Sequence, residues 1–221
     1  MYGLRRNLLA TVSLLALGTS APAADWTGFY IGLNAGIASQ KPEFKDLGDD
    51  GGNPLFGFMT LRGSSGTGAT FGGQIGYNWQ IANLVFGFEG DLNWVNSKSN
   101  DTFLGGLNTT ARLNSLATAR GRVGFVAFPS TLIYATGGVA SGRIQSSLGD
   151  TLFTSNLTRT GWVAGGGIEY MFVTNQTIRF EALYNDLGSW VLSNPSGCPG
   201  NYRTRFSHTE TIVRGALNFK W

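Results

Sequence analysis

GWVAGGGIEYMF, residues 161–172, is the stretch of the chain that decides the fold. Successive side chains of a β-strand point to opposite faces, so this stretch has one apolar face and one face of small residues. The apolar face carries Trp162, Ala164, Gly166, Ile168, Tyr170 and Phe172, and the other carries Gly161, Val163, Gly165, Gly167 and Glu169. A soluble sheet turns its apolar face to a core, whereas this pattern is typical of a strand whose apolar face meets lipid.

The same alternation recurs along the chain. It predicts strands in residues 28–38, 69–80, 84–96, 111–125, 131–144, 158–172, 177–187 and 208–221, with the facing of 131–144 left open by its small residues. Short connections alternate with longer ones, which lie at 39–68, 97–110, 145–157 and 188–207. The sequence therefore predicts an all-β fold, an eight-stranded antiparallel up-and-down transmembrane β-barrel with short periplasmic turns and longer outer loops.

The composition excludes several other classes of protein. The chain has 221 residues, 33 glycines and only 13% charged residues, against roughly 25% in soluble domains. After residue 20, no apolar run approaches the roughly 20 residues of a membrane helix. Without Arg5 and Arg6 the chain has 14 basic and 13 acidic residues, so no nucleic-acid partner is expected.

The first 23 residues have the pattern of a secretory signal peptide. Arg5 and Arg6 precede an apolar run at residues 8–17, and small residues at Ala21 and Ala23 suit the signal peptidase. We expect a signal peptide at 1–23, a mature start at Ala24, and a barrel domain at 24–221. An exported chain of this kind is expected in the outer membrane of a Gram-negative cell.

Charged residues on the inward faces form the candidate functional set. They are Glu89, Asp91, Arg120, Arg122, Glu169, Arg179, Glu181 and Arg214. Four charges of each sign can neutralise one another in a lumen that eight strands make too narrow for more than side chains. The alternative interpretation is an ion path gated by exchangeable ion pairs.

No catalytic, metal or cofactor site is expected from the sequence. The only histidine, His208, lies next to Ser207 and near Glu210, but a strand points Ser207 away from the other two. We therefore expect His208 to be a polar residue at the outer rim. Asp46, Asp49 and Asp50 lack the glutamate that ends a helical calcium loop, the glycines at 165–167 lie inside a strand, and Cys198 has no second cysteine.

Aromatic residues near the predicted strand ends are expected to anchor the barrel at the two membrane interfaces. The expected interface set is Trp79, Trp94, Tyr170, Phe172 and Trp221, and Trp26 is assigned to the same role.

Several motifs, taken as an ordered set, resemble those of a known family. They are DWTGFYIGLNAG (25–36), TARGRVGF (118–125), YATGGVA (134–140), the opening stretch, RFEALYNDLG (179–188) and the aromatic-terminated last strand. The set is similar to the small OmpA-like and opacity-type porin family of Gram-negative outer-membrane proteins.

The resemblance implies an eight-stranded barrel placed by the outer-membrane assembly machinery. The preferred interpretation is a non-enzymatic structural barrel that supports the envelope and presents its surface loops. Two alternatives stay open: a small porin for ions or small solutes, and an adhesin or ligand-binding surface antigen. The expected partners are outer-membrane lipid and lipopolysaccharide, the outer-membrane assembly machinery, and a host or envelope partner bound through loops 39–68 and 188–207. No cofactor is expected.

Overall fold

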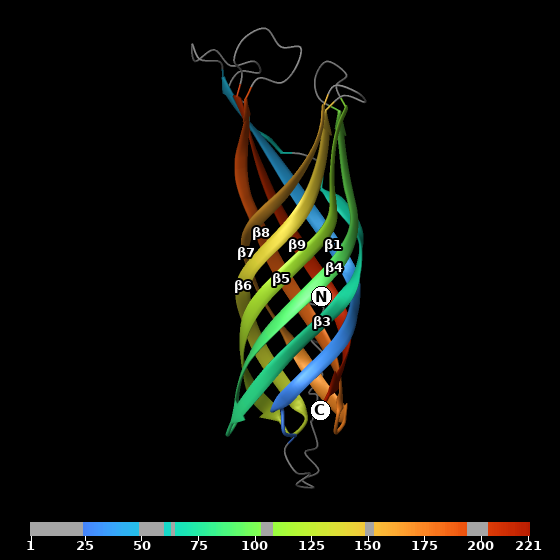
Figure 1. Ribbon diagram of the computed structural model, residues 1–221, viewed down its shortest axis with the longest axis vertical. Coiled ribbons are helices and arrows are strands. Elements are labelled where there is room, and N and C mark those ends of the chain that lie inside the picture. Colours follow the sequence, from blue (N-terminus) through green and yellow to red (C-terminus); the bar gives the residue numbers. More distant parts are fainter. Residues whose placement is uncertain (1–23, 49–59, 63–64, 103–107, 149–152, 194–202) are drawn as a thin grey trace, which may run out of the picture.

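The protein is a closed antiparallel barrel of long, steeply tilted strands (Figure 1). The computed structural model describes residues 24–48, 60–62, 65–102, 108–148, 153–193 and 203–221. Its strands are β1 (Gly28–Gly48), β2 (Thr60–Arg62), β3 (Gly66–Ile81), β4 (Leu84–Thr102), β5 (Asn108–Phe128), β6 (Thr131–Leu148), β7 (Phe153–Val173), β8 (Gln176–Ser193) and β9 (Arg203–Lys220). No described residue is helical, so none of the described segments could cross a membrane as a helix.

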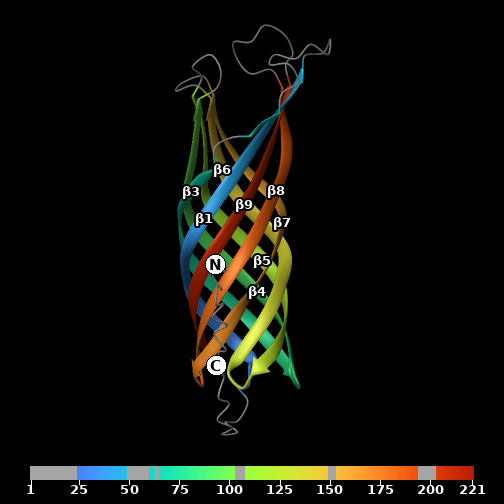
Figure 2. The same cartoon turned by 180° about the vertical axis from the view of Figure 1, so that it is seen from behind.

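Pairing between the first and last long strands closes the barrel. Each long strand pairs with the next along the chain, and β1 also pairs with β9 from Tyr30↔Lys220 onward. The two strands run side by side across Figure 2. Because of this closure, none of the eight barrel strands has an unpaired edge. A sheet surrounded by hydrocarbon must be closed in this way, since its backbone groups have no water to bond. The predicted eight-stranded fold is confirmed, with the three-residue β2 added beside β1 at Glu43↔Arg62.

Tight turns join the strands at the end of the barrel that holds the C-terminus. Two-residue turns lie between β3 and β4, β5 and β6, and β7 and β8. In the first, Ala82 has a φ of 53°, in the left-handed region that two-residue hairpins favour. These are the short connections predicted from the sequence, and in outer-membrane barrels such turns are typical of the periplasmic end.

The outer surface is apolar over the lower part of every long strand. On β1, Leu33 and Ile37 are 74% and 60% exposed, and Phe88 and Phe180 are exposed to a similar degree on β4 and β8. Polar side chains such as Ser39 and Lys41 replace them further along the same face of β1. An exposed apolar band of this extent matches the lipid-facing belt of an outer-membrane barrel, about 25 Å tall.

The strands extend well beyond the predicted ends. The predicted loop 39–68 begins inside β1, which runs to Gly48, and loop 188–207 contains the last part of β8 and the first part of β9. Loops 97–110 and 145–157 are shortened in the same way. The prediction was wrong there because it looked for an apolar outward face, and strands that rise above the lipid carry polar residues on that face.

We expect a charge on the lipid-facing band to destabilise the barrel in a way that depends on depth. Leu33→Arg should lower the free energy of unfolding in lipid vesicles by about 2–4 kcal/mol, and Ser39→Arg on the same face by about 0–1 kcal/mol. Guanidinium titration of the two variants measures the difference. Equal losses would contradict the position of the band.

Candidate functional site: the lumen of the barrel

The lumen is lined by the inward-facing residues of alternate positions on all eight barrel strands. Strand β4 supplies Glu89 and Asp91, β5 supplies Arg120 and Arg122, β7 supplies Glu169, β8 supplies Arg179 and Glu181, and β9 supplies Arg214. Each of these eight residues is buried. Cross-strand register places opposite charges directly beside one another at Glu89↔Arg120, Glu169↔Arg179 and Glu181↔Arg214. Sequence alternation and strand register thus bring the whole predicted set into one region.

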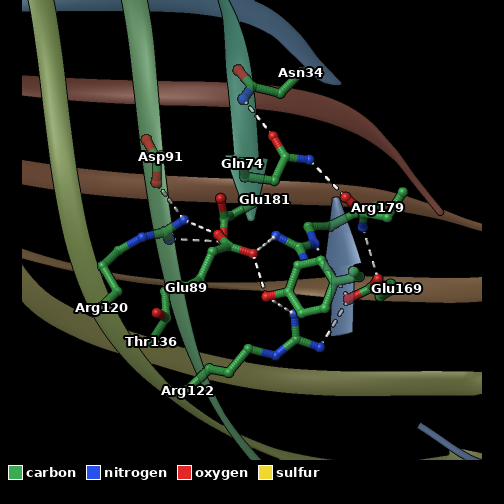
Figure 3. A network of polar contacts seen from close by, with 12 residues as sticks. Asn34, Gln74, Glu89, Asp91, Arg120, Arg122, Thr136, Glu169, Arg179 and Glu181 are labelled. Atoms are coloured by element: carbon green, nitrogen blue, oxygen red, sulfur yellow. Dashed lines mark hydrogen bonds and ion pairs between the residues drawn. The ribbon is translucent and has the colours of Figure 1, made fainter. Parts of the chain in front are cut away.

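Arg120 lies at the centre of three carboxylates (Figure 3). Its guanidinium contacts Glu89, lies 2.9 Å from Asp91 and donates a 3.0 Å hydrogen bond to Glu181. The side chain is only 1% exposed. Such a charge is tolerable in a low-dielectric interior because it is both paired and hydrogen-bonded.

The other three arginines extend the contacts into one continuous network. Arg214 reaches Glu181 at 2.7 Å and Asp91 at 3.4 Å. Arg179 contacts Glu89 and reaches Glu169 at 3.2 Å, and Arg122 meets Glu169 at 2.9 Å. Every carboxylate therefore touches at least one guanidinium, and side-chain exposure in the network does not exceed 4%.

Two buried tyrosines complete the network from opposite walls. The Tyr30 hydroxyl donates to Glu89 at 2.6 Å, and the Tyr134 hydroxyl donates to Glu181 at 2.8 Å. The Arg122 guanidinium also lies 4.6 Å from the centre of the Tyr134 ring, within the range of a cation–π interaction. The tyrosines satisfy carboxylate lone pairs and fill space that four arginines leave.

The glycines of the opening stretch make room for one of these rings. A Cβ atom on the inward-facing Gly167 would lie 2.7 Å from the Tyr134 hydroxyl, well inside contact distance. The Tyr30 ring lies in the same way against Gly76 on β3. Inward glycine thus permits an aromatic side chain from another strand to lie flat on the barrel wall.

Amides continue the hydrogen bonding from the network across to β1. Asn218 donates to Glu169 at 2.9 Å, Gln74 donates to Asn218 at 2.7 Å, and Asn34 donates to Gln74 at 2.7 Å. These buried amides link β9, β3 and β1 without adding charge. The central layer of the lumen is thereby bonded from wall to wall.

An apolar layer closes the lumen on the periplasmic side. Trp26, only 1% exposed, packs there with a buried cluster of Val85, Val126, Leu132, Tyr134 and Met171. The assignment of Trp26 to the membrane interface was wrong. The residue precedes the first strand, so alternation could not indicate its direction, and it turns into the barrel.

The segment that carries Trp26 is held beneath the barrel by hydrogen bonds. The Trp26 backbone N–H donates to the Gln80 side chain at 2.8 Å, and Lys220 donates to the Asp25 backbone carbonyl. The Thr27 N–H donates to the Asp25 carboxylate at 2.8 Å, and this hydrogen bond lowers the pKa of Asp25. These contacts fix Trp26 in the periplasmic mouth.

A second apolar layer fills the lumen on the outer side. Its buried members are Ala38, Val95, Leu113, Leu116, Ala140, Ile144, Val163, Leu183, Leu187, Trp190 and Ile212. Trp190 stacks on Phe206 with ring centres 5.7 Å apart, and the Arg159 guanidinium lies 4.9 Å from the Trp190 ring. Large apolar side chains therefore fill much of the outer part of the lumen, and the eight-residue charge network occupies its middle.

His208, predicted at the outer rim, lies inside the barrel together with Glu210. Both face the lumen and are buried, at 2% and 1% exposure, so His208 is not a residue of the outer rim. The rim assignment was wrong because β9 extends beyond His208 to Arg203. Ser207 is on the opposite face of the strand, and no triad forms.

The remaining candidates from the sequence are the possible metal ligands, the signal peptide and the cysteine. Among residues whose placement is described, no group of three or more His, Cys, Asp or Glu could hold a metal ion. The predicted signal peptide 1–23, Asp49, Asp50 and Cys198 lie outside the described residues, as does the Asp46 side chain.

The expected interface aromatics all lie on the outer surface. Trp79, Trp94, Tyr170, Phe172 and Trp221 are between 44% and 69% exposed. Several stack on neighbours across the strands: Trp94 lies 5.8 Å from Phe71, and Trp221 lies 6.4 Å from Phe29. Rings near the periplasmic turns and rings further up the strands bound the apolar band.

The fold, the apolar band and the filled lumen together define a transmembrane β-barrel of the outer-membrane kind. Residues 8–208 match the outer membrane protein beta-barrel domain family, and the chain belongs to that family. It is therefore an outer-membrane protein.

Relatives and a solved structure agree with this assignment. The chain is 35% identical over 217 residues to a 31 kDa outer-membrane immunogenic protein of Brucella melitensis, covering 92% of this chain and 88% of the relative. It is 34% identical over 170 residues to a 22 kDa outer membrane protein of Rhizobium leguminosarum, covering 76% and 67%. Its fold is similar to the crystal structure of OprG from Pseudomonas aeruginosa, with a TM-score of 0.59, 15% identity and coverage of 91% and 100%.

We expect Arg120→Ala to destabilise the barrel more than any loss of a surface charge. The substitution leaves Glu89, Asp91 and Glu181 facing one another, and breaking a buried pair costs about 3–5 kcal/mol. Lys41→Ala, which removes an exposed cation from β1, should cost no more than about 0.5 kcal/mol. Urea unfolding in lipid vesicles measures both, and a similar small loss in the two variants would contradict the role of the network.

Proposed function

We propose that the protein is a structural, non-enzymatic outer-membrane barrel that supports the envelope and presents chain segments at the cell surface. The observation that carries the proposal is the filled lumen. Apolar layers lie above and below a bonded charge network, so the barrel wall is supported from inside. A site for chemistry would need an accessible nucleophile or base, and the eight charges of the network are buried and engaged with one another.

The same observation argues against the small-porin alternative. Ions cross a pore through hydrated space, and an eight-stranded barrel has little of it once large side chains enter. Trp26 occupies the periplasmic mouth, and Trp190 packs within the outer layer. A conducting state would have to displace both apolar layers and separate the ion pairs between them.

Presentation of surface segments is supported by the arrangement of the strands and by the names of relatives. The longer connections lie at the end opposite the tight turns, where β8 and β9 extend above the apolar band. Relatives named outer-membrane immunogenic proteins are consistent with a role as a surface antigen. The proposed partners are outer-membrane lipid and lipopolysaccharide, the assembly machinery, and a host or envelope molecule at the surface segments.

A closed lumen predicts that the protein does not admit small solutes. Proteoliposomes that carry the refolded chain should swell in isotonic arabinose no faster than protein-free liposomes, whereas a general porin at equal density should swell them rapidly. Light scattering measures the rate. Swelling that rises in proportion to the amount of this protein would support a porin instead.

The proposed orientation predicts which connections antibodies can reach on intact cells. An epitope tag inserted into the connection between Ser193, the last residue of β8, and Arg203, the first residue of β9, should be stained by antibody on whole cells. A tag inserted at Thr174, in the tight turn between β7 and β8, should be stained only after the outer membrane is permeabilised. The reverse pattern would overturn the orientation.

A further inference from the structure

Strand β9 carries a buried carboxylate that the charge network does not include. Among the described residues the buried acids are Glu89, Asp91, Glu169, Glu181 and Glu210, while the buried arginines are Arg120, Arg122, Arg179 and Arg214. Four acids are paired with the four arginines, and Glu210 is the fifth. A buried carboxylate without a counter-charge is costly, so its surroundings require an explanation.

An apolar row separates Glu210 from the network. Strand register aligns Leu183, Ile212 and Ala38 across β8, β9 and β1, and all three belong to the outer apolar layer. Arg214 is four residues from Glu210 along β9, a Cα separation of about 13 Å. The arginines of the network therefore do not neutralise this carboxylate.

The row above the apolar row is polar. Glu210 lies directly between Asn185 of β8 and Gln40 of β1 in the cross-strand register, and His208 is the next inward residue of β9. Asn185 is 0% exposed and His208 is 2% exposed. Five polar side-chain atoms of this row have no hydrogen-bond partner among the described residues. They are both carboxylate oxygens of Glu210, the amide oxygen and nitrogen of Asn185, and the Nε2 of His208.

We propose that Glu210, His208 and Asn185 form a site for one divalent first-row metal cation. The sequence His-x-Glu on a strand points both side chains to the same face, with Cα atoms about 7 Å apart, a separation that one bound ion can bridge. Imidazole nitrogen, carboxylate oxygen and amide oxygen are all ligands of such cations. The ion would supply the positive charge that Glu210 lacks and would satisfy the polar atoms of this row.

The site lies in the outer half of the lumen. Strand β9 begins at Arg203, so His208 lies roughly 17 Å along the strand from the outer end. The site occupies the β8, β9 and β1 sector of the lumen, and the apolar side chains of Leu113, Leu116 and Ile144 project from β5 and β6. The outer half of the lumen thus has one polar wall within an apolar layer.

Zinc binding to the untagged, refolded mature chain tests the proposal. The chain has one histidine and one cysteine, so a Cys198→Ser background removes the only thiol. Equilibrium dialysis against Zn²⁺ with excess Mg²⁺ should give one bound ion per chain. Glu210→Gln and His208→Ala should each weaken binding at least tenfold, and Glu43→Gln, an exposed acid on β1, should leave it unchanged.

Two further measurements keep the test decisive if a variant is less stable. In NMR spectra, zinc should shift the ¹⁵N resonances of the single histidine ring in the wild-type protein and not in Glu210→Gln. In EDTA, Glu210→Gln should melt at or above the wild-type temperature because it removes the unpaired charge, and zinc should raise only the wild-type temperature. Zinc bound equally by Glu210→Gln, or no zinc bound by the wild type, would overturn the site and leave the row filled by water alone.

Discussion

Ion pairing inside a closed and narrow barrel is the interaction on which the rest of this structure depends. Lipid outside requires that every strand be paired, and closure of eight strands leaves a lumen only as wide as its own side chains. Charges placed there cannot be hydrated from the sides. They persist because Arg120, Arg179 and Arg214 each contact more than one carboxylate.

The layers around the network follow from the same constraint. A charge network is strong only where the dielectric is low, and water entering from either end would weaken it. The Trp26 cluster on the periplasmic side and the larger cluster around Leu116 and Trp190 on the outer side exclude that water. The barrel is therefore a packed core surrounded by a sheet, with lipid taking the place of the solvent.

Much of the fold follows from the sequence because lipid demands a regular pattern. Alternation in residues such as those of β7 gave the strand number, the facing and the inward charges, and the three tight turns gave the topology. The strand ends could not be found in this way, since Ser39 and Lys41 on β1 continue the strand above the lipid without an apolar face.

Only part of the site could be predicted from the sequence. Opposite charges at inward positions indicated the network, but partners depend on register, which brought Arg179 of β8 to Glu89 of β4. The apolar layers were hidden because inward Leu116 and Leu183 look like ordinary apolar residues. Trp26 was misplaced because it precedes the first predicted strand, and His208 was misplaced because it was taken as the first residue of a strand that begins at Arg203.

Single-channel recording across a planar bilayer tests the central claim most directly. The wild-type chain, refolded and shown by its heat-modifiable migration to be inserted as a barrel, should give no reproducible conductance steps at any voltage the bilayer tolerates. Regular steps in the wild-type protein would contradict a lumen closed by ion pairs and two apolar layers.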